Sequence, residues 1–405
     1  MAGRIRAKTA WRSDTDRQRP AEIVTQARIA LYYAAFYGAN GVFLPFWPVW
    51  LLSRGLNAVD IGIIFACTSA ARVFTVPLVA QIADRRGDRK PLIVIFAAIS
   101  AMLYLLYPVS QNFGVLLVVS IFASTTWFAG SPLGESLTII AAKREGFEYA
   151  RVRLWGSIAF IVIAIGAGHL LEGRSPDMIY YVGLVVVVIM VGSTLGLPNP
   201  KVEASTSSTF PLLEILRQPS FLLFLAAAGC VQSSHGVYYA FATIHWRSVG
   251  LDDTVIGLLW AEGVIAEIVL FAFAVSVLRK LEPEKLIMLG GLAGLVRWSI
   301  LANTDSLPVL ILIQVLHAFT FGAAHLGAIH FMARTVPAQL SATAQSVYAA
   351  AVMGIASGGS MFLSGWLYGQ AAGKAYFAMA ALGAAGAMCA AALPKAASAE
   401  PISGR

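Results

Sequence analysis

Long apolar runs divide this chain at regular intervals. The 405-residue sequence is 58% hydrophobic and 12% charged, whereas a soluble globular domain carries about 25% charged residues. A helix needs about 20 apolar residues to cross a bilayer. Runs of about that length fall at 28–52, 61–82, 91–109, 114–141, 154–171, 178–197, 220–246, 255–278, 286–303, 308–331, 346–369 and 375–393. The sequence therefore predicts an all-α membrane protein with twelve transmembrane helices.

The positive charges indicate which side of the membrane each loop faces. Short loops rich in Lys and Arg stay in the cytoplasm. If the basic loop at 80–90 is cytoplasmic, the loops and tails on that side hold 23 of the 29 Lys and Arg residues. The loops on the other side hold only Arg54, Arg174, Arg247 and Lys374. We therefore expect a multi-pass protein of the bacterial inner membrane with both termini in the cytoplasm.

The sequence also divides into two similar halves. Its longest internal hydrophilic segment separates six apolar runs from six, and residues of the first half recur in the second at an offset of 195 positions. For example, Gly41 and Val42 correspond to Gly236 and Val237. We expect a cytoplasmic tail at 1–27, disordered up to residue 26, then pseudo-symmetric six-helix bundles at 28–197 and 219–393, a cytoplasmic loop at 198–218 and a C-terminal tail at 394–405.

The loop between the second and third runs has a distinctive spacing. Its key residues are Asp84, Arg85, Gly87, Arg89 and Lys90. This pattern resembles the signature loop of the major facilitator superfamily, although Ala80 replaces the leading glycine. Gly87 permits a sharp turn, and Asp84 can meet a helix N-terminus or an Arg across a cytoplasmic gate. The resemblance implies a transporter whose binding site lies between two six-helix halves; an ordinary basic loop is the alternative.

Few ionisable side chains lie inside the apolar runs. Such a group at mid-bilayer costs at least about 2.5–3.5 kcal/mol and normally faces a cavity or a partner. They are Arg72, Glu135, Glu262, Glu267, Arg297, His235, His317, His325 and His330. The offset between the halves places Arg72 at the position equivalent to Glu267, and Asn40 at the position equivalent to His235. We therefore expect both halves to contribute to one polar cavity, while Glu135 and His330, near helix ends, could instead reach water.

Glu267 and His317 are the predicted proton-coupling groups, with Glu135 as a further candidate. Burial favours the protonated form of a carboxylate, which suits a proton carrier. Glu262 and Glu267 lie on one run and point about 140° away from each other on a helix. Both cannot face one cavity squarely, and we favour Glu267.

The first run is rich in aromatic residues, and several of them share a helical face. Tyr37, Asn40 and Trp47 lie on that face, which could stack an aromatic ring or a sugar, although an interfacial aromatic belt is the alternative. A substrate carboxylate could form a two-pronged contact with Arg72 or Arg297. The predicted substrate-binding residues are Tyr37, Asn40, Trp47, Arg72, His235, Arg297 and His325.

Two groups within the major facilitator superfamily resemble this chain more specifically. Arg297 and the Leu316-His317 pair are similar to the ninth and tenth helices of lactose permease, but Thr320 replaces the Glu that handles the coupled proton there. The 3-phenylpropionate permease group is similar over nearly the whole chain. That resemblance is strongest at 41–50, 152–160, 263–267, 296–298 and 314–326. It implies proton-driven uptake of an aromatic carboxylate.

Other functions fit the sequence less well. It contains no nucleophile elbow, P-loop, metal-ligand cluster or nucleotide motif, which argues against an enzyme, an ATP motor, a bound metal and a cofactor. Its cations lie at helix ends rather than in a basic patch, which argues against nucleic acid. We expect a monomer whose partners are a small molecule, the proton and the lipid bilayer. The open alternatives are a sugar or nucleoside proton symporter, efflux of a hydrophobic solute, and a membrane sensor without net transport.

Overall fold

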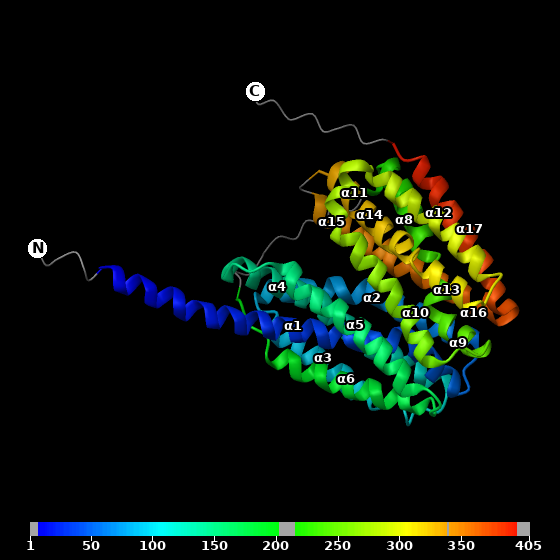
Figure 1. Ribbon diagram of the computed structural model, residues 1–405, viewed down its shortest axis with the longest axis horizontal. Coiled ribbons are helices and arrows are strands. Elements are labelled where there is room, and N and C mark those ends of the chain that lie inside the picture. The colour runs from blue at the N-terminus through cyan, green and yellow to red at the C-terminus, as the bar shows by residue number, and fades with distance from the viewer. Residues whose placement is uncertain (1–6, 202–214, 338–339, 395–405) are drawn as a thin grey trace, which may run out of the picture.

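The computed structural model of this chain describes residues 7–201, 215–337 and 340–394. Its helices form two groups, which Figure 1 shows in blue to green and in green to red. The N group consists of α1 (Ala7–Ser53), α2 (Ala58–Arg86), α3 (Lys90–Tyr104), α4 (Phe113–Glu145), α5 (Tyr149–Leu171) and α6 (Asp177–Leu195).

The helices of the C group are interrupted more often than those of the N group. It consists of α8 (Pro219–Ser233), α9 (Gly236–Ser248), α10 (Asp253–Ala272), α11 (Ala274–Lys280), α12 (Pro283–Leu301), α13 (Leu307–Gln314), the π-helix η1 (Ala318–Ala323), α14 (Ala324–Thr335), α15 (Ser341–Tyr348), the π-helix η3 (Ala349–Ala356), α16 (Ser357–Ala371), the 3₁₀ turn η4 (Ala372–Ala375) and α17 (Tyr376–Ala391).

The helices coincide with the apolar runs. Nine helical segments of the described residues are long and apolar enough to cross a membrane. The segment Thr343–Ala391 contains two successive long helices, α16 and α17, whereas the apolar helix α3 is shorter. Each predicted run falls on one helix or on consecutive helices, and the described ranges contain no strand.

Local sequence sets the ends of α2. The Asn57 side chain accepts a hydrogen bond from the Asp60 amide, and the Asp60 side chain accepts one from the Asn57 amide, both over 3.0 Å. This reciprocal cap satisfies two amides that have no partner within the helix. At the other end, Gly87 adopts φ 65°, which a glycine reaches without the steric cost of a side chain. The sharp turn predicted at Gly87 is confirmed.

The N-terminal segment differs from the prediction. Residues 7–26 continue α1, whereas the sequence predicts a disordered tail there. Ala, Lys, Arg, Gln and Glu recur in this segment, and these residues have high helix propensity. A helix that has already nucleated in the membrane span extends at little cost. The predicted central loop at 198–218 and the C-terminal tail at 394–405 lie mostly outside the described residues.

Several predicted spans of the C group are interrupted near their middle. The run at 220–246 breaks at Ser234 and His235, between α8 and α9. The Ser234 hydroxyl donates to the Val231 carbonyl over 2.7 Å, and such local bonds compete with the regular helix ladder. The runs at 308–331 and 346–369 contain the π-helices, which are frequent at functional sites.

Glycines bring the two groups into close contact at one end of the molecule. A Cβ atom added at Gly62 of α2 would lie 2.8 Å from the Met361 carbonyl oxygen of α16. One added at Gly168 of α5 would collide with the Asp253 carbonyl oxygen of α10. No side chain can be accommodated at either crossing without a shift of the backbone. We call this end the far end.

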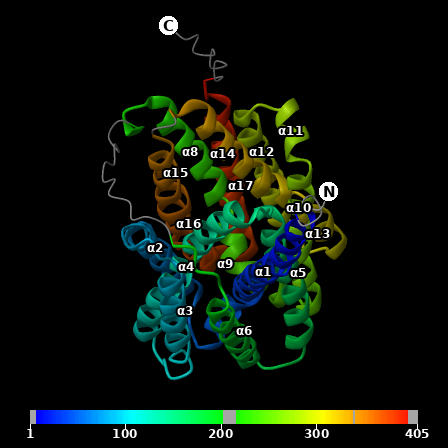
Figure 2. The same cartoon turned by 90° about the vertical axis from the view of Figure 1, so that its left-hand side faces the viewer.

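At the opposite end, which carries residues 84–90 and is called the loop end here, the groups diverge. α2 stays close to the C group from Gly62 as far as Val73. A Cβ atom added at Gly354 of η3 would collide with the Val73 side chain. In Figure 1, α9 and α16 lie close to the N group, whereas α11 and α15 lie away from it. Figure 2 shows the C group above the N group, with α9 and α1 between them. The groups therefore form a V that is closed at the far end.

Candidate functional site

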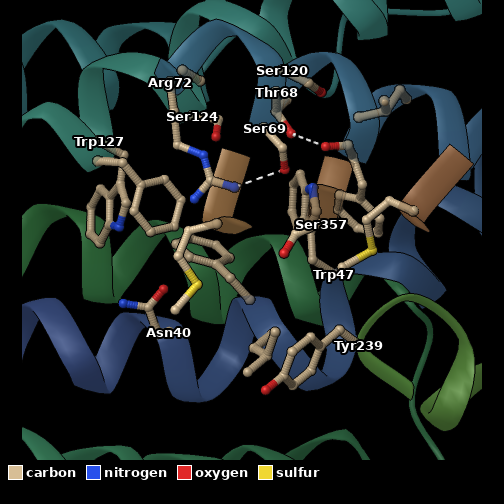
Figure 3. A pocket seen from close by; sticks show the side chains of 18 of the residues that line it. Asn40, Trp47, Thr68, Ser69, Arg72, Ser120, Ser124, Trp127, Tyr239 and Ser357 are labelled. Atoms are coloured by element: carbon tan, nitrogen blue, oxygen red, sulfur yellow. Dashed lines mark hydrogen bonds between the residues drawn. The ribbon is translucent and has the colours of Figure 1, made fainter. Parts of the chain in front are cut away.

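A cavity of about 410 Å³ lies between the two groups, within the size range of small-molecule sites. Its walls come from α1, α2, α3, α4 and α6 on one side, and from α8, α9, η1, η3 and α16 on the other. The predicted site residues Asn40, Trp47 and Arg72 line it (Figure 3). Arg72 is the one charged residue among those that line this cavity.

Arg72 has few partners for a cation in an apolar setting. One of its terminal nitrogens donates to Ser69 Oγ over 2.9 Å, as the dashed line in Figure 3 marks. Its guanidinium carbon lies 4.3 Å from the centre of the Phe128 ring. Its Nε is buried without a hydrogen-bond partner, and no ion pair within the described ranges includes Arg72. Since intramembrane cations normally have a partner, this guanidinium has unused capacity to bind an anion.

Aromatic rings form another part of the cavity wall. The Trp47 ring stacks on Trp50 with centroids 4.6 Å apart and meets Tyr107 edge-on at 4.8 Å. The Tyr104 ring lies 5.5 Å from Trp47, and its hydroxyl donates to the Tyr180 carbonyl over 3.1 Å. These neighbours fix the rings in place, so they offer a preorganised surface to another aromatic ring.

A second polar group lies within the C group and does not line the cavity. Arg297 is completely buried. Its guanidinium bonds to His317 Nδ1 at 3.0 Å, Thr320 Oγ1 at 3.2 Å and Gln314 Oε1 at 2.5 Å. His235 Nε2 lies 3.2 Å from Thr320 Oγ1. We call these five residues the buried cluster. It brings together three of the predicted residues, and its internal bonds engage both terminal nitrogens of Arg297, while the buried Nε of Arg297 has no partner.

Replacing each arginine by glutamine should affect the stability of the protein differently. Arg297→Gln removes a guanidinium that satisfies several buried groups, so we expect a loss of about 3 kcal/mol of stability. Arg72→Gln removes a cation with one hydrogen bond and is expected to melt no lower than the wild type. Thermal unfolding of both variants in detergent would measure the difference. An Arg297→Gln variant as stable as the wild type would contradict the structural role of the cluster.

Glu267 lies beside the buried cluster. Its Oε2 is 3.9 Å from His317 Nε2, and its side chain is 20% exposed. Two rings separate these groups from the cavity. His235 stacks on Tyr239 at 5.3 Å and His317 stacks on Phe321 at 5.6 Å, and both Tyr239 and Phe321 line the cavity. The rings of Tyr239 and Phe321 therefore lie between the cavity and the side chains of His235, His317 and Glu267.

The equivalent positions of the two halves do not share the cavity as expected. Arg72 and Asn40 of the N group line it, whereas Glu267 and His235 are not among its lining residues. The break between α8 and α9 explains the place of His235, because the ring there bonds inward to Gln232 and Thr320 rather than facing the N group.

Glu135 belongs to a third polar group, in the N group. Its carboxylate accepts hydrogen bonds from the Tyr33 hydroxyl at 3.1 Å and from the Tyr149 hydroxyl, and it lies 3.4 Å from Arg153 Nε. The Arg153 guanidinium lies 3.8 Å from the centre of the Tyr37 ring. The predicted residues Tyr37 and Glu135 are thus brought together, but away from the cavity lining. Sequence reasoning missed Arg153 because the apolar run begins only at residue 154, whereas in the structure α5 begins at Tyr149 and includes Arg153.

The other predicted membrane residues lie apart from the cavity. The His325 ring stacks on Phe321 at 5.9 Å, and its Nδ1 is buried without a partner. Glu262 lines a separate pocket of about 310 Å³ whose other lining residues are apolar. Of the two glutamates on α10, Glu267 is therefore the one that lies against the buried cluster.

The gate motif at the loop end is tied to the N group. Arg89 donates to Asp84 over 2.7 Å and to Ser136 of α4 over 2.8 Å. Arg85 lies in the last turn of α2, and Lys90 opens α3. Among the described residues, the hydrogen bonds of Asp84 and Arg89 stay within the N group and do not cross the V.

Comparison with known proteins identifies the family. The model of the MFS_1 like family matches residues 26–379. The chain belongs to the MFS_1-like family. This MFS_1-like protein is 32% identical over 374 residues to the probable 3-phenylpropionic acid transporter of Escherichia coli K12, covering 89% of this chain and 95% of that one. It is 24% identical over 330 residues to the lactose permease of Citrobacter freundii, covering 75% and 78%. Both resemblances inferred from the sequence are confirmed.

Solved structures show the same fold at lower identity. The nucleoside transporter NupG has a TM-score of 0.80 at 16% identity, covering 91% of this chain and 98% of that one. An inward-facing bacterial homolog of the human lysosomal transporter Spinster has a TM-score of 0.69 at 13% identity, covering 92% and 96%. The MFS_1-like protein is therefore a multi-pass, all-α membrane protein with two pseudo-symmetric bundles, and its relatives are transporters.

Proposed function

We propose that this MFS_1-like protein is a secondary active transporter that moves a small aromatic carboxylate, such as 3-phenylpropionate, together with a proton across the bacterial cytoplasmic membrane. The observation that carries the proposal is the cavity between the groups, where Arg72 lies without a counter-charge and aromatic rings form part of the wall. A carboxylate would supply the counter-charge, and an aromatic body would pack on the rings. The name of the relative from Escherichia coli supports the same substrate class.

The V shape supports alternating access. The basic loop assigns the loop end to the cytoplasm, so we assign both termini to that side and the conformation to an inward-open state. Opening the glycine crossings at the far end while the loop end closes would expose the same cavity to the outside. Binding would shift the equilibrium between these two states.

Glu267 and His317 are the proposed proton-coupling groups. They are in contact, and the rings of Phe321 and Tyr239 connect their surroundings to the cavity. A substrate that displaces these rings would change the environment of the carboxylate and of the imidazole. Glu135 is the second candidate. One carboxylate anion moving with one proton carries no net charge, so we expect the pH difference rather than the membrane potential to drive uptake.

Counterflow in proteoliposomes tests the proposed function. Vesicles loaded with unlabelled 3-phenylpropionate should transiently accumulate the labelled compound from outside, without ATP. Vesicles loaded with lactose or a nucleoside should not. Protein-free vesicles provide the background for passive diffusion of the acid. Counterflow that depends on a sugar or a nucleoside, and not on the aromatic acid, would replace the proposed substrate class.

A further inference from the structure

We infer that Arg72, Ser69 and Ser124 form the binding site for one anionic group of the substrate, so that the cavity selects singly charged aromatic anions over neutral analogues and dianions. The inference rests on the proposed function and names the part of the cavity that recognises charge. It also assigns charge recognition to the N group alone, and excludes Arg297 from direct contact with substrate in this state.

Arg72 has N–H groups that are not engaged in hydrogen bonds. Its one hydrogen bond, to Ser69, leaves Nε without an acceptor and leaves other N–H groups of the fork available. The Phe128 ring covers one face of the guanidinium at 4.3 Å, which fixes its plane. The Nε of Arg297 is also without a partner, but Arg297 is completely buried, does not line the cavity, and bonds to three side chains through its terminal nitrogens. An anion entering the cavity therefore meets one available cation.

Two serine hydroxyl groups lie on the same side of the cavity as Arg72. Ser69 accepts from Arg72, so its own proton is available to donate. Ser124 lies one helical turn before Phe128 on α4, on the same helix face as the ring that Arg72 covers, and it also lines the cavity. Thr68 and Ser100 differ, because their hydroxyls donate to backbone carbonyls over 3.0 and 3.2 Å. Figure 3 shows Ser69 and Ser124 on the same side of the cavity as Arg72.

The net charge of the occupied cavity favours a substrate with one carboxylate. With one lining cation, a single carboxylate leaves the occupied cavity neutral. A second carboxylate would lie in an apolar cavity without a partner, which is strongly unfavourable. A neutral amide could accept a hydrogen bond from Arg72 but would bring no negative charge, so the cation in the cavity would stay uncompensated and the contact would be weaker than an ion pair. The same cavity therefore rejects both classes for electrostatic reasons, whatever the fit of the ring.

Calorimetric binding to purified protein in nanodiscs tests this site. The probes are 3-phenylpropionate, its neutral amide 3-phenylpropanamide and the dianion phenylsuccinate. The wild type should bind the monoanion roughly 10- to 100-fold more tightly than the amide, the range expected for a charge-assisted bond. Arg72→Gln should reduce that preference to about threefold or less, and Arg72→Lys should restore part of it. Arg86→Gln, at the exposed end of the same helix, is the matched control and should behave as the wild type.

These binding measurements distinguish a failure of the proposed anion site from a failure of the proposed transport function. If Arg72→Gln keeps the preference for the acid over the amide, the anion site lies elsewhere, and the transport proposal stands. If the wild type binds the dianion more tightly than the monoanion, the charge argument is wrong. If the wild type binds none of the aromatic acids, both proposals fail. A melting temperature of Arg72→Gln equal to or above that of the wild type shows that lost binding does not come from misfolding.

Discussion

Replacing Gly168 by tryptophan is expected to stop transport almost completely while the protein still folds and inserts. Gly168 faces the Asp253 carbonyl oxygen at the far end, where even a Cβ would collide. A tryptophan there would hold α5 and α10 apart, so the far end could not close and the inward-open state would be depopulated. We expect uptake to fall at least about 100-fold, which corresponds to a penalty of about 2.7 kcal/mol on the closed far end.

An introduced cysteine reports the conformation directly. Ser357 lines the cavity, so Ser357→Cys in a background without the three native cysteines should gain reactivity towards an impermeant maleimide added outside when Gly168→Trp is present. Gly166→Trp, two positions earlier on the same helix and with no atom within 4 Å of its Cβ position, is the control. It should change neither uptake nor labelling. Identical behaviour of the two tryptophan variants would contradict the assignment of the glycine crossings as the closed gate.

Replacing Glu267 by glutamine is expected to abolish accumulation against a gradient while exchange of substrate continues. Glu267 lies against His317 behind the cavity wall, and glutamine keeps its shape but cannot take up a proton. Electroneutral symport should accumulate substrate about tenfold for each unit of pH difference, since one pH unit is worth about 1.4 kcal/mol. In Glu267→Gln the initial rate of pH-driven uptake should fall to that of protein-free vesicles, in which the acid enters by passive diffusion alone.

Glu262 provides the matched control on the same helix. It lines the separate apolar pocket rather than contacting the buried cluster, so Glu262→Gln should keep uphill uptake. Counterflow and pH-driven uptake of both variants in the same vesicles separate coupling from binding. Unaltered uphill uptake in Glu267→Gln, with a pH-independent exchange rate, would remove Glu267 from the proton role.

The sequence predicted the helices well because membrane insertion leaves few choices. An apolar run of about 20 residues must satisfy its backbone internally, and a helix does so within one segment. The helix ends at Gly87 and Asn57 follow from local bonds and could likewise be anticipated. The broken segments could not. The break at Ser234 involves a distant contact as well as its local bond, because Trp298 Nε1 of α12 donates to the Ser234 hydroxyl over 3.0 Å, and hydrophobic periodicity does not contain such contacts.

The candidate site was predicted only in part for the same reason. Hydropathy identified Arg72 as an unusual residue, and internal symmetry related it to Glu267. Neither could show that Arg72 lacks a counter-charge within the described residues, or that Glu267 lies behind the wall formed by Tyr239 and Phe321. The ion pair between Arg153 and Glu135 joins α5 to α4, so it appears only when those helices pack.

Proton movement in proteoliposomes tests the central claim most directly. Purified protein is reconstituted with a trapped pH dye and no imposed gradient, and 3-phenylpropionate, a disaccharide or a nucleoside is then added outside. We predict internal acidification with the aromatic acid alone, faster than in protein-free vesicles and in vesicles with Glu267→Gln, and unchanged when valinomycin and potassium hold the potential at zero. Acidification no faster than in the protein-free vesicles, while labelled 3-phenylpropionate still exchanges through the protein, would contradict proton-coupled transport.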